Sequence, residues 1–103
     1  MRTNSFIVQK YLEKPLLISG RKFDIRVWVL FTHDLKVYFF PQGYIRTSSY
    51  KYNTDEKSIN DNNIHLTNNA VQKFNKDYGK YEDNNQLSFR HLENVVTNAG
   101  GSY

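Results

Sequence analysis

The chain has 103 residues and a formal net charge of +4, and it contains no cysteine, which excludes a disulfide-stapled secreted scaffold and a cysteine-based metal site. This length supports one domain with a small core, and the longest uninterrupted apolar run, residues 27–31, is far shorter than the about 20 residues that span a bilayer. The first five residues lack the apolar core of a signal peptide, so we expect a soluble cytoplasmic protein.

Short apolar stretches separated by turn residues recur through the first half of the chain. Such a pattern predicts an antiparallel β meander with short connections. The predicted strands cover residues 6–8, 22–32, 36–40 and 44–47, and an apolar triplet occupies residues 16–18. Turns are predicted at Ser19-Gly20, at His33-Asp34 and at residues 41–43.

The second half of the chain is more polar. Residues 48–64 contain many Ser, Asn, Asp and Lys and predict a surface loop, and residues 75–86 are polar again. Residues 65–74 are mixed, and their apolar side chains are expected to be buried: Leu66, Val71 and Phe74.

The last predicted element is an amphipathic helix. Its apolar residues fall at the spacings of one helix face: Phe89, Leu92, Val96 and Ala99. Ser88 is suited to cap its N-terminus, and Gly100-Gly101 is suited to end it. The whole pattern therefore predicts an α+β fold, an antiparallel β meander with a C-terminal helix.

Alternation along the strand at residues 22–32 places Lys22, Asp24 and Arg26 on one face, about 6–7 Å apart. The apolar side chains between and beyond them point the other way and predict a core: Phe23, Ile25, Val27 and Val29. Such a row can bind an anionic ligand with its cation, because Lys and Arg contact phosphate oxygens and Asp contacts a metal or a ribose. A solvated ladder of salt bridges would give the same pattern.

Two further polar groups are candidates for a site. Arg46 precedes a run of hydroxyl side chains, which suits a carboxylate or phosphate, and also suits an ordinary surface. A second group can bind a ligand or serve as turns and caps: His65, Thr67, Asn68 and Asn69. The histidines are too scattered for a zinc site, and the sequence has no glycine-rich phosphate loop.

Several blocks of sequence resemble the tubulin tyrosine ligase-like family, in family order and at family-like spacing. They are residues 9–18, 20–30, 43–49 and 65–73, and residues 77–83 are similar to the tyrosine ligase branch. The resemblance implies that residues 1–103 form part of an ATP-grasp catalytic domain, with both flanks missing. In that fold a nucleotide lies between two α+β lobes.

The resemblance also implies a reaction. An ATP-dependent ligase would join tyrosine, glutamate or glycine to a tubulin carboxylate through an acyl phosphate, with catalysis resting on positioning and charge neutralisation. ATP and Mg²⁺ are the implied cofactors, and the metal ligands are expected outside this chain. The implied partners are tubulin or microtubules, through their acidic tails, and a free amino acid, with no nucleic acid and no membrane. We expect an association with the cytoskeleton or cilium, and no activity for this stretch alone.

Family roles carry over residue by residue. A hinge strand that holds adenine resembles Gln9, Lys10, Tyr11 and Leu12. Lys22 and Asp24 resemble a nucleotide-contacting pair, and Thr67 and Asn68 resemble further nucleotide contacts. Arg26 is the implied catalytic residue, facing the γ-phosphate or the acyl phosphate. Arg46 and Lys73 resemble substrate-binding residues.

Two alternatives stay open. A non-catalytic module that binds tubulin tails, or a vestigial paralogue, would explain the absence of family metal ligands and the surplus of Lys and Arg. A nucleic-acid binder is disfavoured, because the aromatic residues alternate as core residues do.

Overall fold

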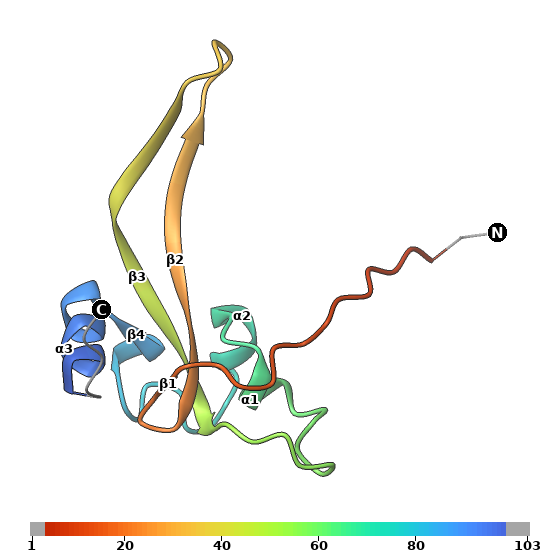
Figure 1. Cartoon of the computed structure of the whole chain (residues 1–103). Helices are drawn as coiled ribbons and strands as arrows, with labels where there is room; N and C mark the ends of the chain where they lie inside the picture. Colours follow the sequence, from red (N-terminus) through yellow and green to blue (C-terminus); the bar gives the residue numbers. More distant parts are fainter. Residues whose placement is uncertain (1–3, 99–103) are drawn as a thin grey trace.

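The structure is a computed structural model that describes residues 4–98. Its elements in chain order are β1 (Leu17–Ile18), β2 (Arg21–Phe31), β3 (Val37–Lys51), α1 (Asn62–His65), α2 (Asn69–Gln72), the 3₁₀ helix η1 (Asp83–Asn85), β4 (Gln86–Leu87) and α3 (Phe89–Asn98). The strands form one antiparallel sheet in the order β1-β2-β3-β4 (Figure 1). The α+β class and the antiparallel meander are confirmed.

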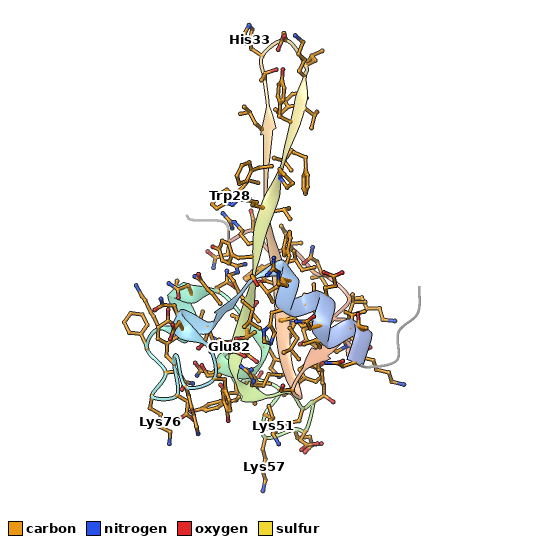
Figure 2. All side chains as sticks on the ribbon, turned by 90° about the vertical axis from the view of Figure 1, so that its left-hand side faces the viewer. Trp28, His33, Lys51, Lys57, Lys76 and Glu82 are labelled. Atoms are coloured by element: carbon orange, nitrogen blue, oxygen red, sulfur yellow. The ribbon has the colours of Figure 1, made fainter. Side chains whose placement is uncertain are left out.

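Strands β2 and β3 form a long hairpin that rises from the body of the molecule, with His33 at its tip (Figures 1 and 2). At the tip, the Thr32 amide donates to the Lys36 carbonyl at 2.9 Å, and the Leu35 amide donates to the Thr32 carbonyl at 3.0 Å. The predicted hairpin turn at His33-Asp34 is therefore confirmed.

The predicted turn at residues 41–43 is wrong, because β3 continues through it. The register gives the reason: one residue of β2, Val27, faces these three residues of β3. The extra residues form a bulge, where the missing N–H of Pro41 costs no ladder hydrogen bond. Two predicted strands are thus one bent strand, which also takes residues 48–51 out of the predicted surface loop.

The core of the described chain is small and largely polar. Its buried apolar side chains are Ile18, Ile45 and Ile64. Gln72 is fully buried beside them, and its amide oxygen accepts from the Ser49 N–H at 3.0 Å.

The predicted burial of Leu66 and Phe74 is wrong, since these side chains are 42% and 81% exposed, and Val71 is half-buried. The helices α1 and α2 are each four residues long. They bury His65 and Gln72 in place of the apolar side chains that the sequence predicted. Helix α1 also replaces the end of the predicted loop at residues 48–64.

The predicted core along β2 is wrong. Phe23 is half-buried, but Ile25, Val27 and Val29 are 40–59% exposed. The short strands β1 and β4 pair only with the lower part of the hairpin, so its upper part is a two-stranded arm that no other described element covers (Figure 1). The radius of gyration, 16.5 Å, accordingly exceeds the about 13 Å of a compact chain of this length.

Of the elements predicted near the two ends of the described chain, the first strand is wrong and the last helix is confirmed. The strand predicted at residues 6–8 is wrong, because residues 4–12 lie outside the sheet and make no strand pairing (Figure 1). Helix α3 is confirmed, and it begins directly after Ser88, whose carbonyl accepts from the His91 amide at 3.1 Å. Ala99 and the predicted stop at Gly100-Gly101 lie outside the described residues. No helix within residues 4–98 is long and apolar enough to cross a membrane.

Candidate functional site

Four of the predicted site residues lie on the central strands of the sheet: Lys22, Asp24, Arg26 and Arg46. Asp24 of β2 faces Arg46 of β3 in the register, and the Arg46 Nε donates to Asp24 Oδ1 at 2.8 Å while Nη2 bonds the second oxygen. The hydrogen bond that Arg46 donates to the Asp24 carboxylate raises the pKa of Arg46. The ion pair therefore runs between strands and not along β2, as a Lys22–Asp24–Arg26 ladder would.

Lys22, one step earlier on the same face of β2, belongs to a different cluster. Its ammonium donates to the His65 carbonyl at 2.9 Å and to the Tyr11 hydroxyl at 3.2 Å, and it lies 4.8 Å from the centroid of the Tyr11 ring. The extended N-terminal segment, β2 and α1 thus meet at one ammonium group.

A cavity of about 400 Å³ adjoins this cluster, lined by Tyr11, Glu13, Ile59 and His65. Its volume falls within the about 300–1,000 Å³ of small-molecule sites. An aromatic ring, an imidazole and an aliphatic side chain suit a planar ring system. The neighbouring Lys22 ammonium supplies the positive charge that an anionic group on that ligand requires.

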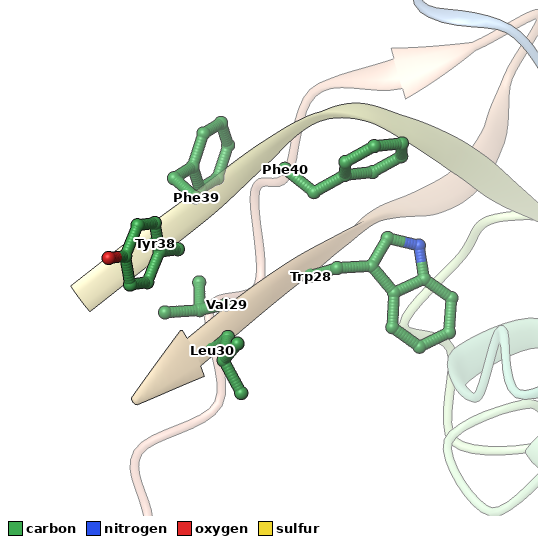
Figure 3. Close-up of a pocket in the computed structure, with 6 residues that line it drawn as sticks. All are labelled: Trp28, Val29, Leu30, Tyr38, Phe39 and Phe40. Atoms are coloured by element: carbon green, nitrogen blue, oxygen red, sulfur yellow. The ribbon is translucent and has the colours of Figure 1, made fainter. Parts of the chain in front are cut away.

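Arg26 lies higher, where β2 enters the arm. Its guanidinium carbon is 4.9 Å from the centroid of the Trp28 ring, within the range of a cation–π contact. Above it, apolar side chains of both strands line a shallow pocket of about 310 Å³ (Figure 3): Trp28, Val29, Leu30, Tyr38, Phe39 and Phe40.

The other predicted residues are spread over the body. Gln9, Lys10 and Leu12 are exposed on the N-terminal segment, so the predicted hinge strand is absent from the described sheet, and only Tyr11 reaches the Lys22 cluster. Thr67 is buried, while Asn68 is exposed at the start of α2.

Lys73, at the end of α2, is exposed and lies 5.0 Å from the centroid of the Phe74 ring. The structure brings Tyr11 to Lys22 and Asp24 to Arg46, and the binding roles of all these residues stay predictions.

Sequence reasoning missed a buried ion pair beneath the sheet. Arg21 forms a two-pronged contact with Glu82, with Nη1 2.9 Å from Oε2, and Nη1 also donates to the Ser48 carbonyl at 3.0 Å. The Thr47 hydroxyl donates to Glu82 at 2.9 Å, and the Arg21 guanidinium lies 4.3 Å from the centroid of the Tyr81 ring. Arg21 and Glu82 fall within two of the sequence blocks that resemble the family, residues 20–30 and 77–83, and no other feature of the sequence pointed to this ion pair.

The described residues do not form a magnesium site. Within residues 4–98 there is no group of three or more His, Asp or Glu side chains that could hold a metal ion. The Asp24 carboxylate, the predicted neighbour of a metal, is already held by Arg46.

Comparison with known proteins gives a consistent result. The model of the Tubulin-tyrosine ligase family matches residues 1–98. Similar proteins include tubulin glycylase 3B of Tetrahymena thermophila (44% identical over 84% of this chain), protein monoglycylase TTLL8 of Homo sapiens (47% over 73%) and tubulin monoglutamylase TTLL4 of Mus musculus (46% over 70%). The chain spans 7%, 9% and 6% of the length of these three relatives.

Proposed function

The chain belongs to the tubulin-tyrosine ligase family, and from this membership we propose that it supplies part of the nucleotide-binding site of an ATP-dependent ligase that joins an amino acid to tubulin. We assign its fold to an ATP-grasp domain, on the same ground. The names of the relatives, glycylases and glutamylases, favour glycine or glutamate as the amino acid, and the family name keeps tyrosine as a candidate. The same assignment predicts a location on microtubules.

The observation that supports this function best is the Lys22 cluster beside the cavity. The exposed edge of Tyr11 and the apolar wall at Ile59 fit a purine ring, and the Lys22 ammonium fits a phosphate or ribose oxygen. These contacts support a nucleotide at the cavity, and we propose no metal ligand among the described residues.

ATP, when bound, would supply the γ-phosphoryl group that activates a tubulin carboxylate as an acyl phosphate, with ADP as the leaving group. Attack by the amine of the amino acid would then form the amide bond and release phosphate and a proton. Arg26 is positioned at the entrance to the arm, and its charge would neutralise the developing phosphate charge. Arg46 would bind the carboxylate of the amino acid, which competes with Asp24 for the Nε and Nη2 donors of the guanidinium. Lys73 would assist at the substrate side.

Titration of the 103-residue chain with ATP tests this proposal. Lys22→Ala and Asp24→Ala are each expected to weaken ATP binding at least tenfold, while Lys57→Ala, an exposed lysine outside the cluster, leaves it unchanged. Equal affinities for all variants would reject the assigned site. Transfer of labelled glycine or glutamate to tubulin, by a protein containing this chain, tests the reaction itself.

A second candidate rests on the surface charge. Exposed Lys51, Lys57 and Lys76 lie at the end of the body opposite the tip of the arm (Figure 2). A non-catalytic module that used these lysines would bind acidic tubulin tails without ATP, and its affinity for the tails would fall steeply as the salt concentration rises. Binding of a polyglutamate peptide at low and high salt, with and without ATP, separates this module from the ligase.

A further inference from the structure

His65 connects the two side chains that the proposed nucleotide site uses. It ends helix α1 and is buried, yet both of its ring nitrogens have partners. Nε2 lies 3.1 Å from the Ser58 carbonyl oxygen, and Nδ1 lies 2.8 Å from the Tyr11 hydroxyl.

These partners determine which nitrogen carries the hydrogen in the neutral ring. A carbonyl oxygen only accepts, so Nε2 must be the N–H that donates to Ser58. Nδ1 is then an acceptor, and the Tyr11 hydroxyl donates to it. The Tyr11 oxygen is left to accept from the Lys22 ammonium at 3.2 Å. The hydrogen bonds therefore run in one direction, from Lys22 through Tyr11 and His65 to the backbone.

The ring is also held from two sides. Tyr11 and Tyr52 both pack edge-on to His65, with ring centroids 5.6 Å apart in each pair and interplanar angles of 81° and 80°. The Tyr52 hydroxyl donates to the Glu13 carbonyl at 2.8 Å, which ties down the segment that contains Tyr11. The same segment makes no strand pairing, so these side-chain contacts are what fix it against the body.

The position of Lys22 follows from this arrangement. Its ammonium has three N–H donors. Within the described chain one donates to Tyr11 and one to the His65 carbonyl, which leaves one for a ligand in the neighbouring cavity.

We propose that His65 is a positioning residue for nucleotide binding: as the neutral Nε2–H tautomer it orients the Tyr11 hydroxyl and, through it, the Lys22 ammonium at the edge of the cavity. This inference rests on the proposed function. His65 and Tyr11 both line the cavity, and His65 acts on the Lys22 ammonium through the Tyr11 hydroxyl.

ATP titrations of the whole 103-residue chain, combined with ¹⁵N NMR of the histidine rings, test this role. Tyr11→Phe removes only the hydroxyl and keeps the ring, and His65→Phe keeps a ring without nitrogens. Each is expected to weaken ATP binding about five- to tenfold, the loss of one hydrogen bond in a chain of them. The double variant should lose no more than either single variant, because both break the same connection.

Matched substitutions at exposed sites on the arm are the controls: His33→Phe and Tyr38→Phe should leave ATP affinity unchanged. His65→Asn, which places an acceptor oxygen near the Nδ1 position, should recover part of the loss that His65→Phe causes. The ¹⁵N spectrum should show His65 as the neutral Nε2–H tautomer, with Tyr11→Phe shifting its Nδ1 resonance.

Three results would overturn the inference. An Nδ1–H tautomer or a cationic His65 ring would contradict the direction of the hydrogen bonds. Unchanged ATP affinity in Tyr11→Phe, whose partly exposed ring keeps its packing, would reject the positioning role and leave the proposed function standing. No ATP binding by the unaltered chain would reject this inference together with the cavity as its nucleotide site.

Discussion

Asp24 and Arg46 lie directly opposite each other on β2 and β3, and each satisfies the charge of the other through two hydrogen bonds. The Arg46 side chain is 16% exposed and that of Asp24 is 37% exposed, so the pair is only partly shielded from water. The family roles give these residues different ligands, a nucleotide and an amino acid. If both proposed roles hold, they are coupled, because a carboxylate that takes the Nε and Nη2 donors of Arg46 displaces the Asp24 carboxylate.

Asp24→Asn is expected to lower the free energy of unfolding by about 1–2 kcal/mol, which is the range of about 1.5–3 kcal/mol for one charge-assisted hydrogen bond reduced for solvent screening of the exposed carboxylate. The oxygen of the new amide can still accept from the Arg46 Nε. Its NH₂ group, however, replaces the second Asp24 oxygen, which accepts from the Arg46 Nη2, so two donors then face each other. Urea unfolding measures the change. Asp55→Asn, at an exposed carboxylate in the loop after β3, is the matched control and should have no effect. Equal stability of both variants would show that the ion pair contributes nothing in solution.

Glu82→Ala should cost far more, about 3–5 kcal/mol, because it leaves the Arg21 charge buried without its partner. The Arg21 side chain is 4% exposed and its Nε already lacks a hydrogen-bond partner, so little relief is available. Since small domains are stable by only about 5–15 kcal/mol, this variant should be close to unfolded at room temperature.

The double variant Arg21→Met, Glu82→Leu supplies the control for this prediction. It removes both charges and keeps apolar volume, so it should recover most of the stability that Glu82→Ala loses. If Glu82→Ala costs less than about 1 kcal/mol in urea unfolding, the pair is exposed in solution.

Local patterns predicted the elements that local forces determine. The β2 strand follows from its β-branched and aromatic residues, and α3 follows from its apolar spacing. Pro41 and Gly43 resemble a turn within the sequence, and only the pairing with β2 makes them a bulge.

The candidate site was predictable only where local alternation or the family resemblance pointed to a residue. Alternation placed Lys22 and Asp24 on one face, and the family resemblance named Tyr11, but the partners of all three come from distant segments. Tyr11 and His65 are 54 positions apart, and Arg21 and Glu82 are 61 positions apart. Such pairs depend on tertiary packing, which no spacing along one element reports.

Gly43→Ala is expected to destabilise the chain by about 3 kcal/mol, the upper end of the cost of overpacking. A Cβ at this position would lie 2.2 Å from the Arg26 carbonyl oxygen and 2.6 Å from the Phe89 ring, so both the bulge and α3 must move. Gly79→Ala is the comparison: its Cβ would make only ordinary contacts, with the Asn84 nitrogen and the Glu82 oxygen each at 3.9 Å, and only its φ of +75° is unfavourable, at about 1–2 kcal/mol. Urea unfolding ranks the two, and an equal or smaller cost at Gly43 would contradict the tight packing of α3 on the bulge.

The tip of the arm should respond to acid. The Thr32 hydroxyl and then Lys36, whose ammonium is 3.2 Å away, hold the pKa of Asp34 below its ordinary value of 3.8. A folded pKa below the unfolded one means that the contribution of this carboxylate is complete above the unfolded value and disappears as the pH falls through the folded value. NMR titration of the Asp34 carboxyl should therefore give a pKa below 3.8.

Thr32→Val should return that pKa toward the ordinary value, because it removes the larger of the two causes. Thr54→Val, at an exposed threonine after β3, should leave it where it was. An Asp34 pKa that is the same with and without the Thr32 hydroxyl would contradict the hydrogen bond at the tip.

Trp28 is the only tryptophan of the chain, and its ring lies 4.9 Å from the Arg26 guanidinium, so its fluorescence reports on that cation. If Arg26 contacts phosphate, ATP must draw the guanidinium away from the indole, and the Trp28 emission should change until the site is saturated. Arg26→Gln should shift the emission in the absence of ligand and abolish the ATP response. Arg90→Gln, at an exposed arginine of α3, should behave like the unaltered chain. An ATP response that persists in Arg26→Gln would arise elsewhere on the molecule, and the phosphate role of Arg26 would then be rejected.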